Sequence, residues 1–305
     1  MHGMSTVIIT QNDHIERGIA QALEQIDLAA LVRGKIVAVK PNETWASRED
    51  CTAVTQADSL RAVLREIKRF EPRALIVTGG AGAGETDEIF RIAGLMDVVE
   101  SEGAEFFDHN RPPFQEVKLE YAPEKDVAGP QASVMVNPRV FEYETLVTLN
   151  QLKVHETATV TLSLKNIAMS YPAADYYGHP RGNEKHKHDF FTDMHSFIAA
   201  MAKRFPAQLA ITVGHPAMIG IGPIGGHTFE TGLVIASTDP IAADAVGAQL
   251  LGFTARGVHH IWEAARLGLG ECDTERMKFP AMSLDDAFAV FTRAAYGHSL
   301  SLEHA

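Results

Sequence analysis

Short apolar runs rich in Val, Ile and Leu constrain the fold of this chain more than any other feature. Runs of this length form buried strands, and several are followed by polar or glycine-rich residues. Segments with helical spacing of apolar residues alternate with the runs, at 16–31, at 57–70 and from about residue 87. The alternation predicts an α/β fold with a mixed, largely parallel sheet flanked by helices. The predicted strands are 6–10, 35–39, 74–77, 133–136, 146–149, 209–213 and 232–236.

The length of 305 residues would allow two domains, but α/β folds of this size often form one continuous sheet. We therefore expect a single domain over residues 1–305. Residues 104–145 include an acidic, proline-containing connection and one predicted strand. This segment predicts a small lobe or insertion, and a second lobe would leave a cleft beside the main sheet.

Composition argues against several classes of function. No apolar run approaches the roughly 20 residues that span a bilayer, so we expect a soluble, cytoplasmic protein with no membrane partner. A net charge of −12 argues against nucleic-acid binding, which depends on clustered Lys and Arg. Cys51 and Cys272 cannot by themselves hold a thiolate cluster or build a disulfide framework.

The strand predicted at 146–149 leads into the segment with the candidate catalytic residues. Lys153 and His155 are two positions apart, so in an extended chain both side chains would point into one pocket. Lys165 follows a segment, 159–164, whose pattern fits a strand or a helix. A desolvated lysine beside a second cation can act as a base, and histidine does so near neutral pH. The structural alternatives are an ion pair for Lys153, a carbonyl contact for His155 and a helix cap for Lys165.

Residues that could bind a small anionic ligand follow several predicted strands. Lys40 and Asn42 come directly after the strand at 35–39, and a glycine-rich turn after the next strand could cradle a phosphate or carboxylate with its N–H groups. The alternatives are a lysine that extends to solvent along the sheet edge and glycines that serve tight turns. The predicted substrate-binding residues are Lys40, Asn42, Gly79, Gly80, Asn166 and Gly222.

A polar loop in the second half of the chain carries His179, His186 and His188. If the loop is extended, His186 and His188 can reach one metal ion, and imidazole suits zinc, nickel, copper and iron. We therefore consider a transition metal site here, although no zincin spacing is present. The alternative is a basic, solvated lid over the substrate.

Three aspartates have structural interpretations. Asp189 is predicted to cap a helix that ends at Arg204, and Asp239 to cap a second helix with Pro240 at its first position. Asp244 lies on or beside an apolar stripe, and a buried carboxylate needs a partner. That partner could be the amides of a glycine-rich loop or a lysine of the pocket.

Several motifs, in order, resemble the domain of unknown function 362 family. They are Val39-Lys40-Pro41-Asn42, Leu152-Lys153-Val154-His155, Leu164-Lys165-Asn166, Gly220-Ile221-Gly222-Pro223 and Ala236-Ser237-Thr238-Asp239-Pro240-Ile241-Ala242-Ala243-Asp244, within about residues 35–270. Many relatives carry a ferredoxin-like module with cysteine-rich motifs, which this chain does not have. The resemblance therefore implies no iron–sulfur cluster. The family is also distantly similar to the nickel-pincer lactate racemases, in which histidines and a cofactor-bearing lysine act on a small hydroxy acid, and Lys165 and His155 are the positions to test for that analogy.

Two functions from different classes are compatible with these residues. The first is an enzyme that acts on a small anionic metabolite, such as a carboxylate or phosphate, by Lys/His acid–base or metal-assisted chemistry. Lys40 and the glycine-rich loops would position the metabolite, and Lys153, His155 and Lys165 would transfer protons. The second is a non-catalytic accessory protein that binds and delivers a metal or cofactor.

Overall fold

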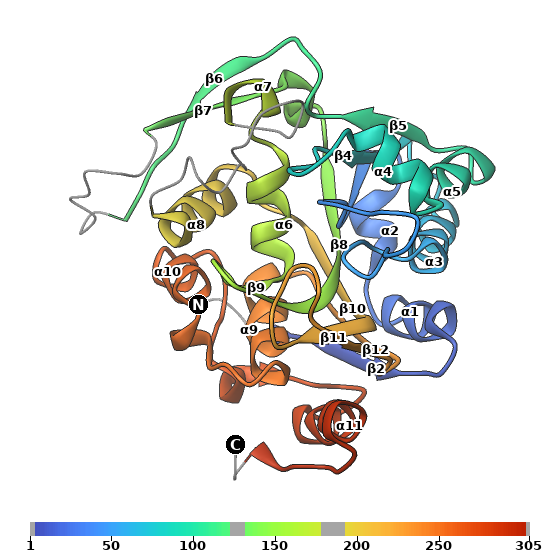
Figure 1. The fold of residues 1–305 in the computed structure, drawn as a ribbon, viewed down its shortest axis with the longest axis vertical. Coiled ribbons are helices and arrows are strands. Elements are labelled where there is room, and N and C mark those ends of the chain that lie inside the picture. The colour runs from blue at the N-terminus through green and yellow to red at the C-terminus, as the bar shows by residue number, and fades with distance from the viewer. Residues whose placement is uncertain (1–3, 123–131, 178–192, 303–305) are drawn as a thin grey trace.

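Strands between residues 8 and 237 form one nine-stranded sheet in the computed structural model, which describes residues 4–122, 132–177 and 193–302 (Figure 1). These strands are β2 (Ile8–Gln11), β3 (Ile36–Pro41), β4 (Ala74–Gly79), β5 (Glu105–Asp108), β8 (Thr145–His155), β9 (Thr159–Thr161), β10 (Leu209–Ile219), β11 (His227–Phe229) and β12 (Leu233–Ser237). Their order is β2-β12-β10-β8-β3-β4-β5, with β9 paired to β8 and β11 to β10. The neighbours from β10 to β5 are parallel, and the other pairs are antiparallel. The predicted mixed, largely parallel sheet is confirmed.

Helices cover both faces of this sheet, which confirms the predicted fold class (Figure 1). Val37 and Val39 of β3 belong to the core under one set of helices, whereas Ala38 belongs to the core under the other. The alternation follows from the two-residue period of a strand, and it places Lys40 on the same side as Ala38. The first set is α1 (Ile15–Leu23), α2 (Leu28–Val32), α3 (Ala57–Lys68) and α5 (Leu95–Ser101), and the second is α6 (Ser163–Ser170), α8 (Met194–Arg204), α9 (Pro240–Leu250), α10 (His259–Arg266) and α11 (Leu284–Tyr296).

The central strand β8 is much longer than the predicted 146–149, and all of its residues are buried. It continues through Lys153 and His155, so the chain is extended at both residues. The segment at 159–164, which the sequence left open, contains both elements: β9 ends at Thr161 and α6 begins at Ser163.

Three local predictions were wrong. The helix expected at 16–31 is two helices, α1 and α2, because the Asp27 carboxylate accepts the Ala30 N–H at 3.1 Å and starts a new helix. The strand expected at 209–213 continues to Ile219, where β10 pairs with β11. Asp193 caps α8 by accepting the Ser196 N–H, while Asp189 lies outside the described residues.

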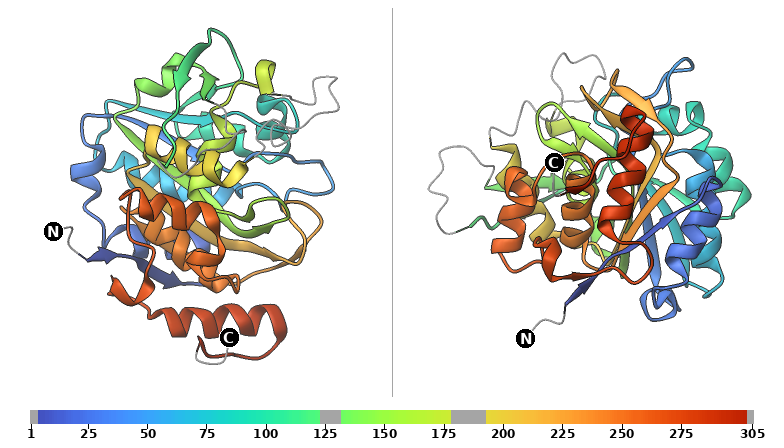
Figure 2. Two further views of the ribbon diagram at one scale, coloured as in Figure 1. Left: turned by 90° about the vertical axis from the view of Figure 1, so that its left-hand side faces the viewer. Right: turned by 90° about the horizontal axis from the view of Figure 1, so that it is seen from below.

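Two further strand pairs and two short helices lie outside the elements described so far. The segment at 104–145 places β5 in the main sheet, whereas β6 (Gln115–Lys118) and β7 (Ser133–Val136) form a separate antiparallel pair. Near the N-terminus, β1 (Ser5–Thr6) pairs in parallel with β13 (Met277–Lys278), so these distant segments lie side by side (Figure 2). The short helices α4 and α7 span Thr86–Ile92 and Ala174–Tyr177. Among the described residues, none of the helices has both the length and the apolar character that crossing a membrane requires.

Candidate functional site

A cavity opens beyond the carboxyl ends of β3 and β4, the edge at which parallel sheets bind ligands. The segments that follow these two strands form part of its wall, and α6 forms another part. Its volume is about 490 Å³, including the opening to solvent. The residues that line it are Lys40, Asn42, Glu43, Thr44, Gly80, Gly82, Ala83, Thr161, Lys165, Asn166, Met169 and Ser170.

Lys40 lies near the end of β3 and is 1% exposed, so it does not extend to solvent along the sheet edge. Its ammonium group forms an ion pair with Glu43 and donates to Asn166 Oδ1 at 2.9 Å. Burial lowers the pKa of Lys40, and the Glu43 carboxylate opposes that effect. The partners fix the position of this cation in the cavity wall.

Glu43, which sequence reasoning missed as a site residue, links Lys40 to the glycine-rich loop after β4. Its second carboxylate oxygen, Oε1, accepts the Gly80 N–H at 2.9 Å. A carboxylate three positions after a buried lysine was the available signal, because at that distance the two groups can meet across a turn. Glu43 thus couples the charge of Lys40 to the shape of the loop.

The glycine-rich loop packs closely and uses several of its amides internally. A Cβ at Gly80 would lie 2.2 Å from the Ser170 carbonyl oxygen, so only glycine fits this contact with the end of α6. Several backbone N–H groups of this loop, which the sequence suggested as donors to an anion, donate instead to acceptors within the protein. These pairs are Gly80 N–H with Glu43, Ala81 N–H with Thr86 Oγ1 at 3.2 Å and Ala83 N–H with the Thr44 carbonyl at 3.2 Å.

The amino end of α6 is held by Asp244. The Asp244 carboxylate accepts the N–H groups of Ser163 at 2.9 Å and Leu164 at 3.0 Å, which are the orphan donors of a helix start. Asp244 therefore stabilises the first turn of α6. Its partners are backbone amides, as one of the two predicted alternatives had it, but they belong to α6 and not to a glycine-rich loop. Burial raises the pKa of this carboxyl to about 7.

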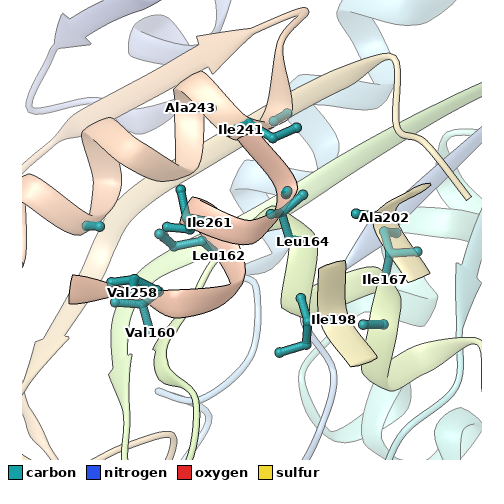
Figure 3. Close-up of a cluster of buried hydrophobic side chains, with 14 of the residues drawn as sticks. Val160, Leu162, Leu164, Ile167, Ile198, Ala202, Ile241, Ala243, Val258 and Ile261 are labelled. Atoms are coloured by element: carbon teal, nitrogen blue, oxygen red, sulfur yellow. The ribbon is translucent and has the colours of Figure 1, made fainter. Parts of the chain in front are cut away.

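The two sides of α6 face different surroundings. Leu164 and Ile167 lie in an apolar cluster with side chains of α8, α9 and α10, among them Ile198 and Ile241 (Figure 3). The other side contributes Lys165, Asn166, Met169 and Ser170 to the cavity wall, which fits the spacing of one helical face. The apolar packing of α6 therefore orients the polar residues toward the cavity.

Lys165 differs from the other lysines of the site. It lines the cavity and is 5% exposed, and in the described ranges its ammonium group forms no hydrogen bond or ion pair. Burial, and after it the charge of Lys40, lowers the pKa of Lys165 to about 7. The Thr161 hydroxyl, buried in the same wall, also has no hydrogen-bond partner within the described part of the chain.

Asn166, beside Lys165, connects the cavity to the sheet. Its amide group donates to the Lys40 carbonyl at 3.0 Å and to Asn150 Oδ1 at 2.8 Å, while its oxygen accepts from the Lys40 ammonium. All of these groups are buried. Asn166 thus orients Lys40 while it lines the cavity.

Lys153 and His155 are buried on β8 but do not line the cavity. The Lys153 ammonium donates to the Ala53 carbonyl and, at 3.4 Å, to Gln151 Oε1. Burial, and after it Lys165, lowers the pKa of Lys153 to about 7, so the two lysines are electrostatic neighbours. His155 Nδ1 accepts the backbone N–H groups of the β8–β9 turn, Thr157 at 3.0 Å and Ala158 at 3.2 Å.

The remaining predicted site residues divide as follows. Asn42 lines the cavity and accepts the Gln151 N–H at 2.9 Å, whereas Gly79 and Gly222 are not on its wall. Gly222 is a close-packing glycine, since a Cβ there would lie 2.2 Å from the Val154 carbonyl oxygen. The predicted metal ligands His179, His186 and His188 lie outside the described residues.

Across residues 4–122, 132–177 and 193–302, no group of three His, Cys, Asp or Glu side chains is placed to hold a metal ion. His155, the position suggested by the racemase analogy, uses Nδ1 for the turn amides.

Comparisons with known proteins show which family the chain belongs to. No curated protein matches the chain, and three chains of solved structures match. One is a protein from Thermotoga maritima, 15% identical, with a TM-score of 0.46; the match covers 79% of this chain and 60% of that chain. The sequence profile of the family described as Domain of unknown function (DUF362) matches residues 37–249, more than half of the chain. The chain belongs to the DUF362 family.

Proposed function

We propose that this protein is an enzyme that binds a small anionic metabolite in the cavity between β3, β4 and α6 and uses Lys165 as an acid–base group. The observation that carries the proposal is the state of Lys165, a buried ammonium on the cavity wall with no partner in the described chain. A buried charge is costly unless it is paired. A carboxylate or phosphate in the cavity would supply the missing partner.

The surrounding charges favour an anion over a cation. Lys40, Lys153 and Lys165 act on one another electrostatically, and Glu43 is the acidic residue among the described residues that line the cavity. Because Glu43 already pairs with Lys40, it offsets only part of this positive charge. The site is thus locally positive in a chain whose net charge is −12.

The chemistry follows from how the lysines are held. Lys40, fixed by Glu43 and Asn166, would position the negative end of the metabolite. Lys165, whose pKa is lowered to about 7 by burial, would exist in both protonation states near neutral pH and could remove a proton from carbon next to a carboxylate or carbonyl. Lys153 and His155, which do not line the cavity, would not contact the metabolite.

The test measures binding and proton transfer separately. Small hydroxy, keto and phosphorylated acids are incubated with the protein in D₂O, and NMR detects deuterium uptake at carbon next to the carboxylate or carbonyl. Lys165→Arg keeps a cation but not a base, since the pKa of arginine exceeds about 12. We expect this variant to retain anion affinity within about fivefold and to lose deuterium uptake.

Lys68→Met is the matched control, because Lys68 lies on α3 and pairs with Glu102 at 3.0 Å, away from the cavity. It should bind and exchange as the wild type does. Binding by the wild type without any deuterium uptake would favour the non-catalytic accessory function. If Lys165→Arg binds the anion and takes up deuterium as the wild type does, Lys165 is not the acid–base group.

A further inference from the structure

We infer that Lys165 also acts as a nucleophile and that the substrate is an aldehyde or ketone bearing a carboxylate or phosphate, which Lys165 binds as an imine. This inference rests on the proposed function of the cavity. It adds a covalent step and narrows the substrate class from anions in general to anionic carbonyl compounds.

The hydrogen bonds of the three buried lysines distinguish the nucleophile from its neighbours. The Lys40 ammonium is held by Glu43 and Asn166, and the Lys153 ammonium points to carbonyl acceptors and lies off the cavity wall. Within the described ranges, the Lys165 amine has no such acceptor and lies on the wall. Attack on a carbonyl carbon requires an accessible, uncommitted nitrogen, and among these three lysines Lys165 meets both conditions.

The surroundings of Lys165 also suit the steps of imine formation. The neutral amine adds to the carbonyl carbon, so that an N–C bond forms and the carbonyl oxygen takes up a proton. The product of this addition is a carbinolamine. Its C–O bond then breaks and the oxygen leaves as water, which carries away the two protons lost by the nitrogen, so that a C=N bond forms. The Thr161 hydroxyl lines the cavity without a protein partner in the described chain, and it can exchange a proton with that oxygen.

Burial strengthens the selectivity of Lys165 over surface lysines. Its pKa, lowered to about 7, leaves roughly half of the amine neutral at pH 7. An exposed lysine with a pKa of about 10.4 is neutral in about one molecule in 2,500 at that pH. We therefore expect Lys165 to react at least about tenfold faster than any exposed lysine, even after allowance for its weaker basicity.

The experiment traps the imine with cyanoborohydride at pH 7. Glyoxylate is the probe, and glycolaldehyde, which has a similar size but no carboxylate, is the neutral control. Intact mass gives the number of reduced adducts, and peptide mapping locates them. The tested proteins are the wild type, Lys165→Met, Lys165→Arg and Lys68→Met, while calorimetry measures oxalate binding without any trapping reagent.

We expect one glyoxylate adduct on Lys165 in the wild type and in Lys68→Met, blocked by oxalate and at least about tenfold weaker with glycolaldehyde. Both Lys165 variants should lack it. Adducts spread over exposed lysines, equal in wild type and Lys165→Met, would overturn the imine. If the wild type binds oxalate, Lys165→Met does not, and the wild type forms no adduct on Lys165, the imine is refuted but the anion site is kept. If the wild type shows neither oxalate binding nor an adduct, both proposals are refuted.

Discussion

Replacement of Lys165 by methionine should stabilise the protein at neutral pH. The change keeps an unbranched side chain of similar length and removes an amine that has no partner in the described chain. In the folded protein the pKa of Lys165 is lowered from 10.5 to about 7, chiefly by burial. The unfolded chain therefore binds a proton more tightly than the folded protein does, and this difference opposes folding.

The magnitude follows from these two pKa values. Their gap, at about 1.4 kcal/mol for each pH unit, corresponds to a cost of about 5 kcal/mol below pH 7 and about 4 kcal/mol at pH 7. Because the folded pKa is depressed, stability rises with pH between about 7 and 10.5. At pH 10.5 the amine is neutral in the folded protein and about half neutral in the unfolded chain, so the cost falls below about 1 kcal/mol.

Urea denaturation of the wild type and Lys165→Met, from pH 6.5 to 10.5, measures the effect as a difference between two curves. Titrations that Lys165 does not influence cancel in the difference. Loss of Lys165 also raises the pKa of Lys153, and this adds to the stabilisation in the same direction over the same pH range. Lys68→Met is the control, and it should differ from wild type by less than about 1 kcal/mol at every pH because Lys68 is a surface residue. A stability difference between wild type and Lys165→Met that does not change with pH would refute the reasoning, since it would mean that the Lys165 ammonium is solvated or paired in solution.

Three further predictions concern other parts of the structure. The His215 side chain donates a hydrogen bond to Asp58 at 3.0 Å, and this bond is the main cause that raises the pKa of His215 to about 9. The protonated imidazole therefore stabilises the fold fully below pH 6.5, and this stabilisation is lost as the pH rises through 9. His215→Asn should reduce the change in unfolding free energy between pH 6 and pH 9.5, measured by urea titration, by about 1–2 kcal/mol. Gly80→Ala should cost about 1–3 kcal/mol by overpacking against Ser170 and lower the melting temperature, and an unchanged melting temperature would contradict the 2.2 Å contact. Burial raises the pKa of the Cys51 thiol, so iodoacetamide at pH 7.5 should modify it more slowly in the folded than in the urea-unfolded protein.

The sequence predicted the layers of the fold better than the details of the site. Apolar runs identify most strands of the main sheet but not β5, β9 or β11. Asp239 with Pro240 marks the start of α9, which the structure confirms. Lys40 was predicted as a site residue because it follows the predicted strand at 35–39, and Lys165 because it follows the segment at 159–164. Both residues line the cavity. The pairing of Lys40 with Glu43 depends on the path of the chain after Pro41, which no periodicity encodes.

Other site features could not be read from local patterns because their partners are distant in the chain. Asp244 was recognised as a buried carboxylate that needs a partner, yet the partner is the start of α6, 80 residues earlier. His155 carries the residue type of a catalytic base but serves the turn that follows it. Gly80 and Gly222 lie in glycine-rich segments of the kind that bind ligands, but in both places close packing against a carbonyl oxygen also explains why the residue is glycine.

The attachment of α6 at both ends limits how this protein can change its length. Asp244 holds its first turn, and the contact between Ser170 and Gly80 holds its last residue. One residue inserted between these points would rotate everything after it by about 100° and move Lys165 or its neighbours away from the cavity. Natural length variation should therefore fall outside 163–170, and a homologue with an insertion inside that segment would have lost this cavity's chemistry.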